Sequence, residues 1–296
     1  MEEFAKLIVI STAWPVIPVE LFFRGYRMIT FSRLGYYGQL GNQMWQYAFL
    51  LGAAARHGND YKVCIPRRLD LPKKAGRFEL NCFRGLSAGP LWGNENLPHK
   101  YTEQSTGFDL AALEQPDGTD FAGYFQSWRY FAHCAEQVKE EFRFHTEIYA
   151  RAKALMSGYE VGRPAVSVNV RRGDYLQHRG THFVCDINYY REAMAGFSGA
   201  RFYVGSDDIN WCRKHLAGIP SVTFIDTTDY VAAFAVIVLC DAHIGSASSF
   251  SWWGAWLSGG RAIFPDSWYV PGALEYSIED LRYPGAEMRP AARYLG

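Results

Sequence analysis

The carboxyl-terminal half of the chain alternates between short apolar runs and helix-like segments, and this alternation constrains the fold most. Apolar runs of strand length begin at residues 165, 200, 221, 242 and 261, and segments of helical length separate them. Strands that alternate with helices in this way form parallel sheets with helices on both faces. The sequence therefore predicts an α/β fold with a doubly wound parallel sheet.

The amino-terminal half is less regular, and it ends in one long amphipathic segment. Short apolar runs such as YKVCIP are mixed with Pro and Gly, and residues 131–156 then show a helical period that predicts a single helix. GYEVGRP at 158–164 is typical of a boundary. We therefore expect an acceptor-side domain over 28–157 and a second domain over 158–296.

Residues 1–27 precede the first strand-like run, which opens at Met28. Their apolar part contains two prolines and a glutamate, which disfavour a membrane-spanning helix. We expect this segment to be an appendage that arises from an upstream start codon.

Polar residues follow the first strand of the predicted sheet, where ligands bind in doubly wound folds. The motif NVRRGDY places Arg171 and Arg172 directly after the strand over 165–170. Guanidinium groups present forked donors that suit phosphate, and Asp174 can hold one of the two arginines in place. The alternative is a structural Arg–Asp pair at a surface turn.

Two further strand ends carry small polar residues. Ser206 and Asp207 follow the second strand in YVGSDDINW, and they either cap the next helix or offer a carboxylate to a base or ribose. In IGSASSFSWWGAW, Ser248, Ser249 and the amide of Phe250 lead into a helix amino terminus, which attracts anions. These three strand ends together suit a nucleoside diphosphate. The tryptophans at 252 and 253 are expected to pack in the core.

A glycine-rich turn precedes the first helix, in GYYGQLGNQMWQYAFLL at 35–51. Gly38 and Gly41 leave room for another group to approach the backbone. Asn42 either caps the helix or takes part in that approach.

The rest of the composition excludes several classes of protein. The formal net charge is zero, which argues against a nucleic-acid binder. The predicted strands are followed by no P-loop or G-x-G-x-x-G motif, and the sequence has no D-x-D triplet to hold a metal-bridged diphosphate. The six cysteines are widely spaced and form no C-x-x-C pair, which indicates a reducing, cytoplasmic setting.

The motifs, taken in order, resemble those of glycosyltransferase family 11, the α-1,2-fucosyltransferases. GQLGNQMWQYAF resembles the amino-terminal glycine motif of that family, and NVRRGDY resembles its H-x-R-R-G-D-Y motif. FYVGSDDINWC and CDAHIGSASSFSWWGAWL resemble the second and third motifs, and GYFQSWRYF resembles a further family segment. The resemblance covers residues 28–275, and Asn169 stands where the family usually has His.

This resemblance implies a glycosyltransferase-B fold, in which two Rossmann-like domains face a cleft. It implies a hexosyltransferase that transfers fucose, with inversion, from GDP-β-L-fucose to the 2-hydroxyl of a galactose-terminated glycan. Neither a metal nor another cofactor is implied, and no nucleic-acid partner. Peripheral association with a membrane surface is left open.

The resemblance also assigns roles to residues. Arg171 would hold the diphosphate, Asp207 would read guanine, and the Ser249–Phe250 backbone would cradle a phosphate. Gly41 and Asn42 would approach the donor from the other domain. The remaining donor-side residues would be Asn169, Arg172, Asp174, Ser206 and Ser248.

No motif identifies the catalytic base, which we expect to be a carboxylate or His of the first domain. Two alternatives remain open. One is a fucosyltransferase of another linkage, of the α-1,6 or protein O-fucosyl type. The other is a GDP-sugar-binding protein without transfer activity. This alternative stays open because Asn169 stands where the family usually has His.

Overall fold

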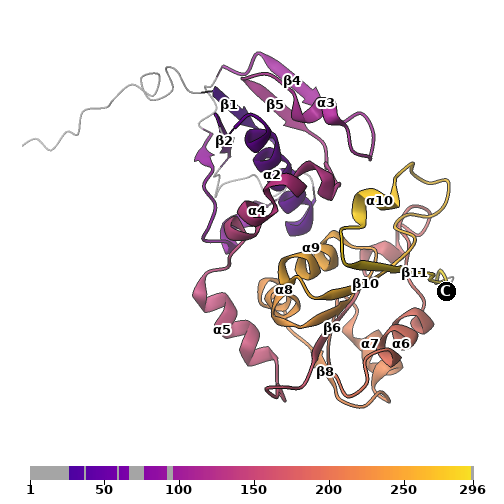
Figure 1. Ribbon diagram of the computed structural model, residues 1–296. Helices are drawn as coiled ribbons and strands as arrows, with labels where there is room; N and C mark the ends of the chain where they lie inside the picture. The colour runs from indigo at the N-terminus through magenta and orange to yellow at the C-terminus, as the bar shows by residue number, and fades with distance from the viewer. Residues whose placement is uncertain (1–26, 37, 59, 67–76, 92–95, 295–296) are drawn as a thin grey trace, which may run out of the picture.

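The computed structural model describes residues 27–36, 38–58, 60–66, 77–91 and 96–294. The expectation for residues 1–26 lies outside these ranges. The chain forms two lobes, and each lobe is built on a parallel sheet with helices packed around it (Figure 1).

The amino-terminal lobe holds a five-stranded sheet in the order β3-β2-β1-β5-β4. Its strands are β1 (Arg27–Thr30), β2 (Tyr61–Ile65), β3 (Gly89–Pro90), β4 (His99–Thr102) and β5 (Thr119–Ala122). The long helix α2 (Leu40–Arg56) packs against β1 and β2 and is buried along most of its length. The shorter elements are η1 (Leu80–Cys82), α3 (Leu110–Leu113), η2 (Trp128–Tyr130), η3 (Ala132–Cys134) and α4 (Ala135–Glu141).

The carboxyl-terminal lobe confirms the predicted doubly wound sheet, in the order β11-β10-β9-β6-β7-β8. Its strands are β6 (Ala165–Val170), β7 (Arg201–Ser206), β8 (Val222–Ile225), β9 (Ala242–Ile244), β10 (Arg261–Pro265) and β11 (Ala286–Arg289). Its helices are α6 (Ile187–Ala195), α7 (Ile209–Leu216), α8 (Tyr230–Leu239), α9 (Ser249–Ser258) and α10 (Ile278–Leu281), with a short η4 (Asp174–Leu176). The pattern had predicted each of these strands and helices except η4, α10 and β11.

The single helix predicted over residues 131–156 is wrong. The chain leaves the helix after α4 and starts α5 (Thr146–Leu155) only after a break. In the break, Phe144 forms a β-bridge with Phe83, and the Arg143 carbonyl accepts from the Arg84 amide at 2.8 Å. These contacts replace the hydrogen bonds that a continuous helix would make there.

This break carries the chain from one lobe to the other. α4 stays with the amino-terminal lobe, while α5 lies along α8 of the carboxyl-terminal lobe (Figure 1). Arg151 of α5 forms an ion pair at 2.9 Å with Asp229, which caps α8. The division of the chain at residue 158 stays a prediction, but α5 packs with the lobe that follows that division.

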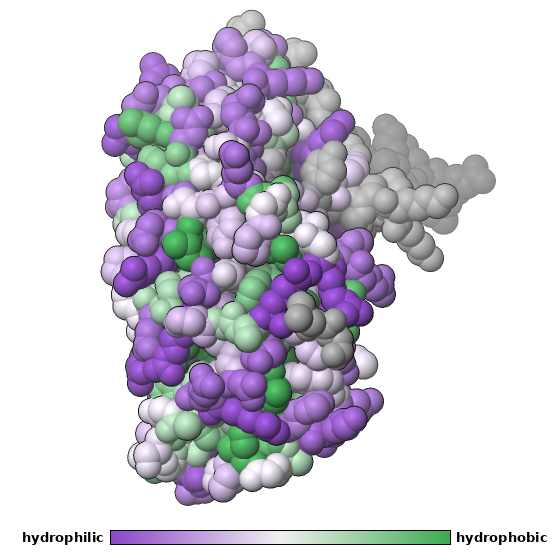
Figure 2. Space-filling model, turned by 90° about the vertical axis from the view of Figure 1, so that its right-hand side faces the viewer, coloured by the Kyte–Doolittle hydropathy of each residue, from purple (hydrophilic) through white to green (hydrophobic). Residues whose placement is uncertain are grey.

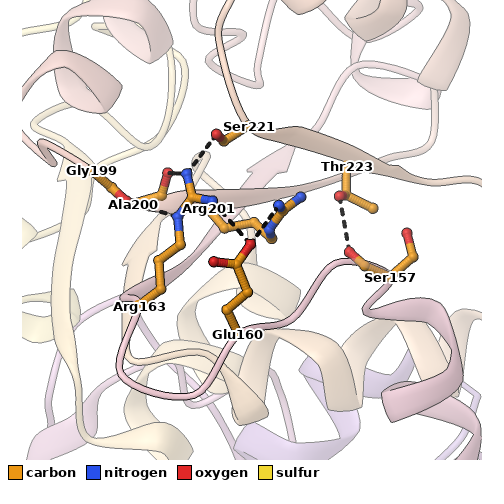
Figure 3. Close-up of polar contacts among 8 residues, drawn as sticks. All are labelled: Ser157, Glu160, Arg163, Gly199, Ala200, Arg201, Ser221 and Thr223. Carbon is orange, nitrogen blue, oxygen red and sulfur yellow. Dashed lines mark hydrogen bonds and ion pairs between the residues drawn. The ribbon is translucent and has the colours of Figure 1, made fainter.

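The segment over 158–164 is tied to the ends of the second sheet. Figure 3 shows Glu160 between the guanidinium groups of Arg163 and Arg201, at 3.2 and 3.1 Å. These hydrogen bonds and charges, with the Arg201 bond the largest contribution, lower the pKa of the Glu160 carboxyl. Arg163 also donates to the Ser221 hydroxyl at 2.6 Å, so this segment holds the starts of β6, β7 and β8 together.

One face of the molecule is mixed in its surface character. In the view of Figure 2, apolar residues are scattered among hydrophilic ones. Across the described ranges, no helix combines the length and apolar character needed to cross a membrane.

The two lobes share one hydrophobic core, and its centre is the contact between α2 and α9. The ring of Trp45 lies 4.2 Å from that of Trp252 and 4.9 Å from that of Trp253, and all three residues are fully buried. The expected packing role of the two tryptophans of α9 is confirmed. Next to them, a Cβ at Gly41 would lie 2.6 Å from Ser249 Oγ and 2.9 Å from the Phe250 amide. Only glycine allows the two helices to approach so closely.

A second contact joins the lobes through a buried carboxylate. Asp280 of α10 is 3% exposed and accepts from the Ser127 hydroxyl at 2.7 Å and from the Phe108 amide at 3.2 Å. Trp128 donates to the Glu279 carbonyl at 3.1 Å. These two contacts help to fix the relative position of the lobes.

Gly41→Ala should destabilise the protein, because the added methyl group forces α2 and α9 apart. Overpacking of this kind typically costs about 1–3 kcal/mol, which denaturant unfolding measures. Gly218→Ala is the matched control, because an added Cβ there meets nothing within 4 Å. Equal stability of Gly41→Ala and the parent protein would show that the lobes are not held by this contact.

Candidate active site

The three polar strand ends lie side by side, as the sequence predicted. β6 is the middle strand, and it pairs with β7 on one side and β9 on the other. Val170 is opposite Ser206, and Val168 is opposite Ile244. The chain therefore leaves all three strands at one edge, where the strand order reverses and ligands of such sheets bind.

Arg171 is held by two carboxylates at this edge. Its Nη2 lies 2.7 Å from Asp174 Oδ1, and its Nη1 lies 3.1 Å from Asp207 Oδ2. Its Nε is buried and finds no partner among the described residues. Because this Nε is buried, a diphosphate could reach the guanidinium only by displacing one of the two carboxylates.

Arg172 is enclosed in the lobe. It is 3% exposed, its Nε lies 3.3 Å from Asp208 Oδ2, and its guanidinium packs 3.9 Å from the Trp211 ring and 4.4 Å from the Tyr294 ring. Of the two arginines, the one that Asp174 holds is Arg171 and not Arg172. The enclosure favours a structural role for Arg172 over direct contact with a donor.

Asp207 and Asp208, which follow β7, have different partners. Asp208 caps α7 by accepting from the Trp211 amide at 3.2 Å, and the Ser206 hydroxyl accepts from the Asp208 amide at 2.9 Å. Asp207 accepts from the Arg172 amide at 2.8 Å in addition to its pair with Arg171. Both oxygens of Asp207 are thus engaged by the arginine motif, and its role toward guanine stays a prediction.

The amino terminus of α9 offers unpaired backbone donors. Ser248 occupies the N-cap position but makes no side-chain capping bond, and the first bond of the helix runs from the Trp252 amide to the Ser248 carbonyl at 3.0 Å. Within the described part of the chain, no group accepts from the amides of residues 249–251. Amides of this kind carry the positive end of the helix dipole and bind anions.

Asn169 joins this helix to the arginine motif. Its Oδ1 accepts a hydrogen bond from the Ser251 hydroxyl at 2.5 Å, and the side chain is half-buried. The residue that replaces the usual His of the family motif therefore holds the first turn of α9 beside the end of β6.

Asn42 links the amino-terminal lobe to the start of α9. α2 begins at Leu40 with Gln39 as its N-cap, so the interpretation of Asn42 as the cap is wrong. The Leu40 amide donates instead to Glu79 at 2.6 Å. Asn42 Oδ1 accepts from the Ser249 hydroxyl at 3.2 Å and is thereby linked to α9.

A series of residues that sequence reasoning missed connects Arg171 with Asn42. Arg171 lies 5.0 Å from the ring centre of Tyr175, which stacks on His182 at 4.1 Å, and His182 lies 5.8 Å from Tyr269. The Tyr269 hydroxyl donates to Gln126 at 3.4 Å, and Gln126 donates to Asn42 at 2.9 Å. We call Tyr175, His182, Tyr269 and Gln126 the rim. Gln126 lies in GYFQSWRYF and Tyr175 closes NVRRGDY, whereas no motif had marked His182 or Tyr269.

Comparisons with known proteins agree with this arrangement. A family model described as Glycosyl transferase family 11 matches residues 109–269. Galactoside alpha-(1,2)-fucosyltransferase 1 of Sus scrofa is 30% identical over 259 residues, which cover 79% of this chain and 67% of that protein. The protein of the same name from Alouatta caraya is 29% identical over 251 residues, with the same shares covered.

Solved structures of POFUT1 share the fold. The complex with GDP matches with a TM-score of 0.53 at 12% identity, and the complex with GDP-fucose matches with a TM-score of 0.53 at 13% identity. Both matches cover 81% of this chain and 98% of the other chain. The two parallel sheets have the arrangement of the glycosyltransferase-B fold, with polar strand ends in the second sheet. The chain belongs to glycosyltransferase family 11.

Arg171 and Arg172 should respond differently to substitution. Arg171→Lys should weaken GDP binding nearly as much as Arg171→Ala, because lysine offers a point charge instead of a fork and releases the two carboxylates toward the diphosphate. A lost charge-assisted hydrogen bond is worth about 1.5–3 kcal/mol, or about 10-fold to 100-fold in Kd. Titration calorimetry with GDP measures this loss.

Arg172→Lys is the paired variant. It should lower the Tm more than Arg171→Lys, because the guanidinium is packed between Trp211 and Tyr294. The half-exposed ion pairs of Arg171 contribute little to stability. The opposite outcome, with Arg172→Lys losing GDP and Arg171→Lys losing stability, would mean that the two roles are reversed.

Proposed function

We propose that this family 11 glycosyltransferase transfers L-fucose from GDP-β-L-fucose to the 2-hydroxyl of a galactoside and forms an α-1,2 linkage with inversion. The observation that carries the proposal is the set of unpaired amides at the start of α9, which Asn169 links to the end of β6 where the arginine motif begins. The curated relatives are named for the same transfer. The natural acceptor in this proposal is a galactose-terminated glycan.

The chemistry follows from where charge develops. When the bond between fucose and phosphate breaks, negative charge grows on the departing GDP. The α9 amides stabilise this charge without rearranging, and Arg171 joins them once the diphosphate displaces one of its two carboxylates. Loss of one such preorganised donor typically costs about 10²–10³ in rate.

In the proposed complex, the carboxyl-terminal lobe binds the donor. Gly41 and Asn42 hold the start of α9 from the other lobe. The rim, which lies between Arg171 and Asn42, faces the acceptor. A cytoplasmic location is part of the proposal and is supported by the six cysteines, none of which forms a disulfide. Association with a membrane surface stays a prediction.

Transfer of labelled fucose from GDP-fucose to lactose should give one product, with an α-1,2 linkage in its NMR spectrum. The rate should be the same in EDTA as in added Mg²⁺ or Mn²⁺, because Arg171 and the amides carry the leaving-group charge.

Three results would each contradict a different part of the proposal. A product of another linkage would overturn the acceptor assignment. GDP-fucose binding without any transfer to galactosides would indicate a binding protein. Loss of activity in EDTA that added metal restores would refute the leaving-group argument.

A further inference from the structure

His182 is the only histidine of the rim, and a tyrosine ring lies on each of two sides of its imidazole. Its ring stacks on Tyr175 at 4.1 Å with an angle of 13° between the planes, and Tyr269 lies on another side at 5.8 Å. Its backbone forms an antiparallel bridge with Tyr269, and the adjacent Val270 amide donates to the Thr181 carbonyl at 2.9 Å. The imidazole is therefore held in one orientation beside the Arg171 site.

The ring nitrogens of His182 remain available to a substrate. Neither nitrogen has a hydrogen bond to any residue in the described ranges, and the residue is half-buried. Partial burial is the main cause that lowers the pKa of His182 below its usual 6.5, and the charges of His178 and Arg171 lower it further while Asp174 opposes them. Tyr175 and Tyr269 face the ring as neutral phenols, because burial raises the pKa of both hydroxyls. The imidazole is thus neutral at neutral pH and can accept a proton.

The other ionisable groups near the rim are bound to partners or stay protonated. Asp174 is bound to Arg171, and burial keeps the Tyr269 phenol protonated by raising its pKa to about 12. Glu103 of the amino-terminal lobe lies close enough to Tyr269 to act on its charge. However, its two oxygens accept from the backbone amides of Tyr124 and Phe125 at 2.6 and 2.8 Å.

We propose that His182 is the general base of the transfer, an inference that rests on the proposed function. A ring nitrogen takes the proton from the acceptor hydroxyl as its oxygen forms a bond to C1 of fucose. The bond from C1 to the phosphate oxygen breaks, and its electron pair leaves with GDP. The imidazolium then releases the proton to water, so charge and atoms balance. This places the base in the carboxyl-terminal lobe, whereas the sequence favoured the first domain.

The test compares His182→Phe with His178→Gln. Phenylalanine keeps the stack on Tyr175 but has no nitrogen, so the protein should fold and bind GDP with unchanged affinity. Removing a general base should lower kcat with lactose by about 10²–10⁴-fold. His178→Gln changes a neighbouring imidazole outside the rim and should leave kcat close to that of the parent protein.

The pH profile gives the second readout. A base must be neutral to act, so kcat of the parent protein should rise with pH through the lowered pKa of His182, below 6.5. In His182→Phe this rise should disappear. A merely structural residue would change the Tm or GDP affinity and leave the rise in place.

The inference fails if His182→Phe keeps the parent kcat and its acid limb, or if it loses GDP affinity in parallel with kcat. Those results leave the proposed function intact when the parent protein still fucosylates lactose. If the parent protein binds GDP-fucose but forms no product, the proposed function fails, and this inference fails with it.

Discussion

The contact between α2 and α9 is the constraint on which the site depends. Gly41 lets the two helices touch at Ser249 and Phe250, and Trp45 fills the space beside the tryptophans of α9. The amino terminus of α9 is therefore positioned by the amino-terminal lobe, while β6 positions Arg171. The group that approaches the backbone at Gly41 is thus the start of α9 in the other lobe, and the proposed anion site depends on both lobes.

The charges around Arg171 link the two halves of the proposed reaction. In the structure, one guanidinium serves two carboxylates, Asp174 and Asp207, so this cluster is negative overall before a donor binds. A diphosphate must therefore gain more from the guanidinium and the α9 amides than it loses to these carboxylates. The same guanidinium lies near His182 and helps to keep that imidazole neutral. The group that stabilises the leaving GDP would then also favour the unprotonated base.

Much of the carboxyl-terminal lobe was predictable, because each strand and helix carries its own apolar period and ends in polar or glycine residues. The elements that were missed, such as α10, are short and depend on distant contacts like that of Asp280 with Ser127. The helical period of residues 131–156 predicted one continuous helix for a related reason. The break in that helix depends on a β-bridge between Phe144 and the distant Phe83. Strand-end position identified Arg171, Asp207 and Ser249, but which carboxylate holds which arginine depends on side-chain geometry. The rim residues His182 and Tyr269 lie in loops without a pattern, and only the fold brings them together.

The central claim is that the first turn of α9 binds the diphosphate of the donor. The most direct measurement is a titration of the ¹⁵N-labelled protein with GDP, followed through the backbone amide resonances of Ser249 and Phe250. The account predicts large shifts of these two amides that saturate with GDP and are much smaller with guanosine. Saturable GDP binding that leaves both amides unmoved would contradict it.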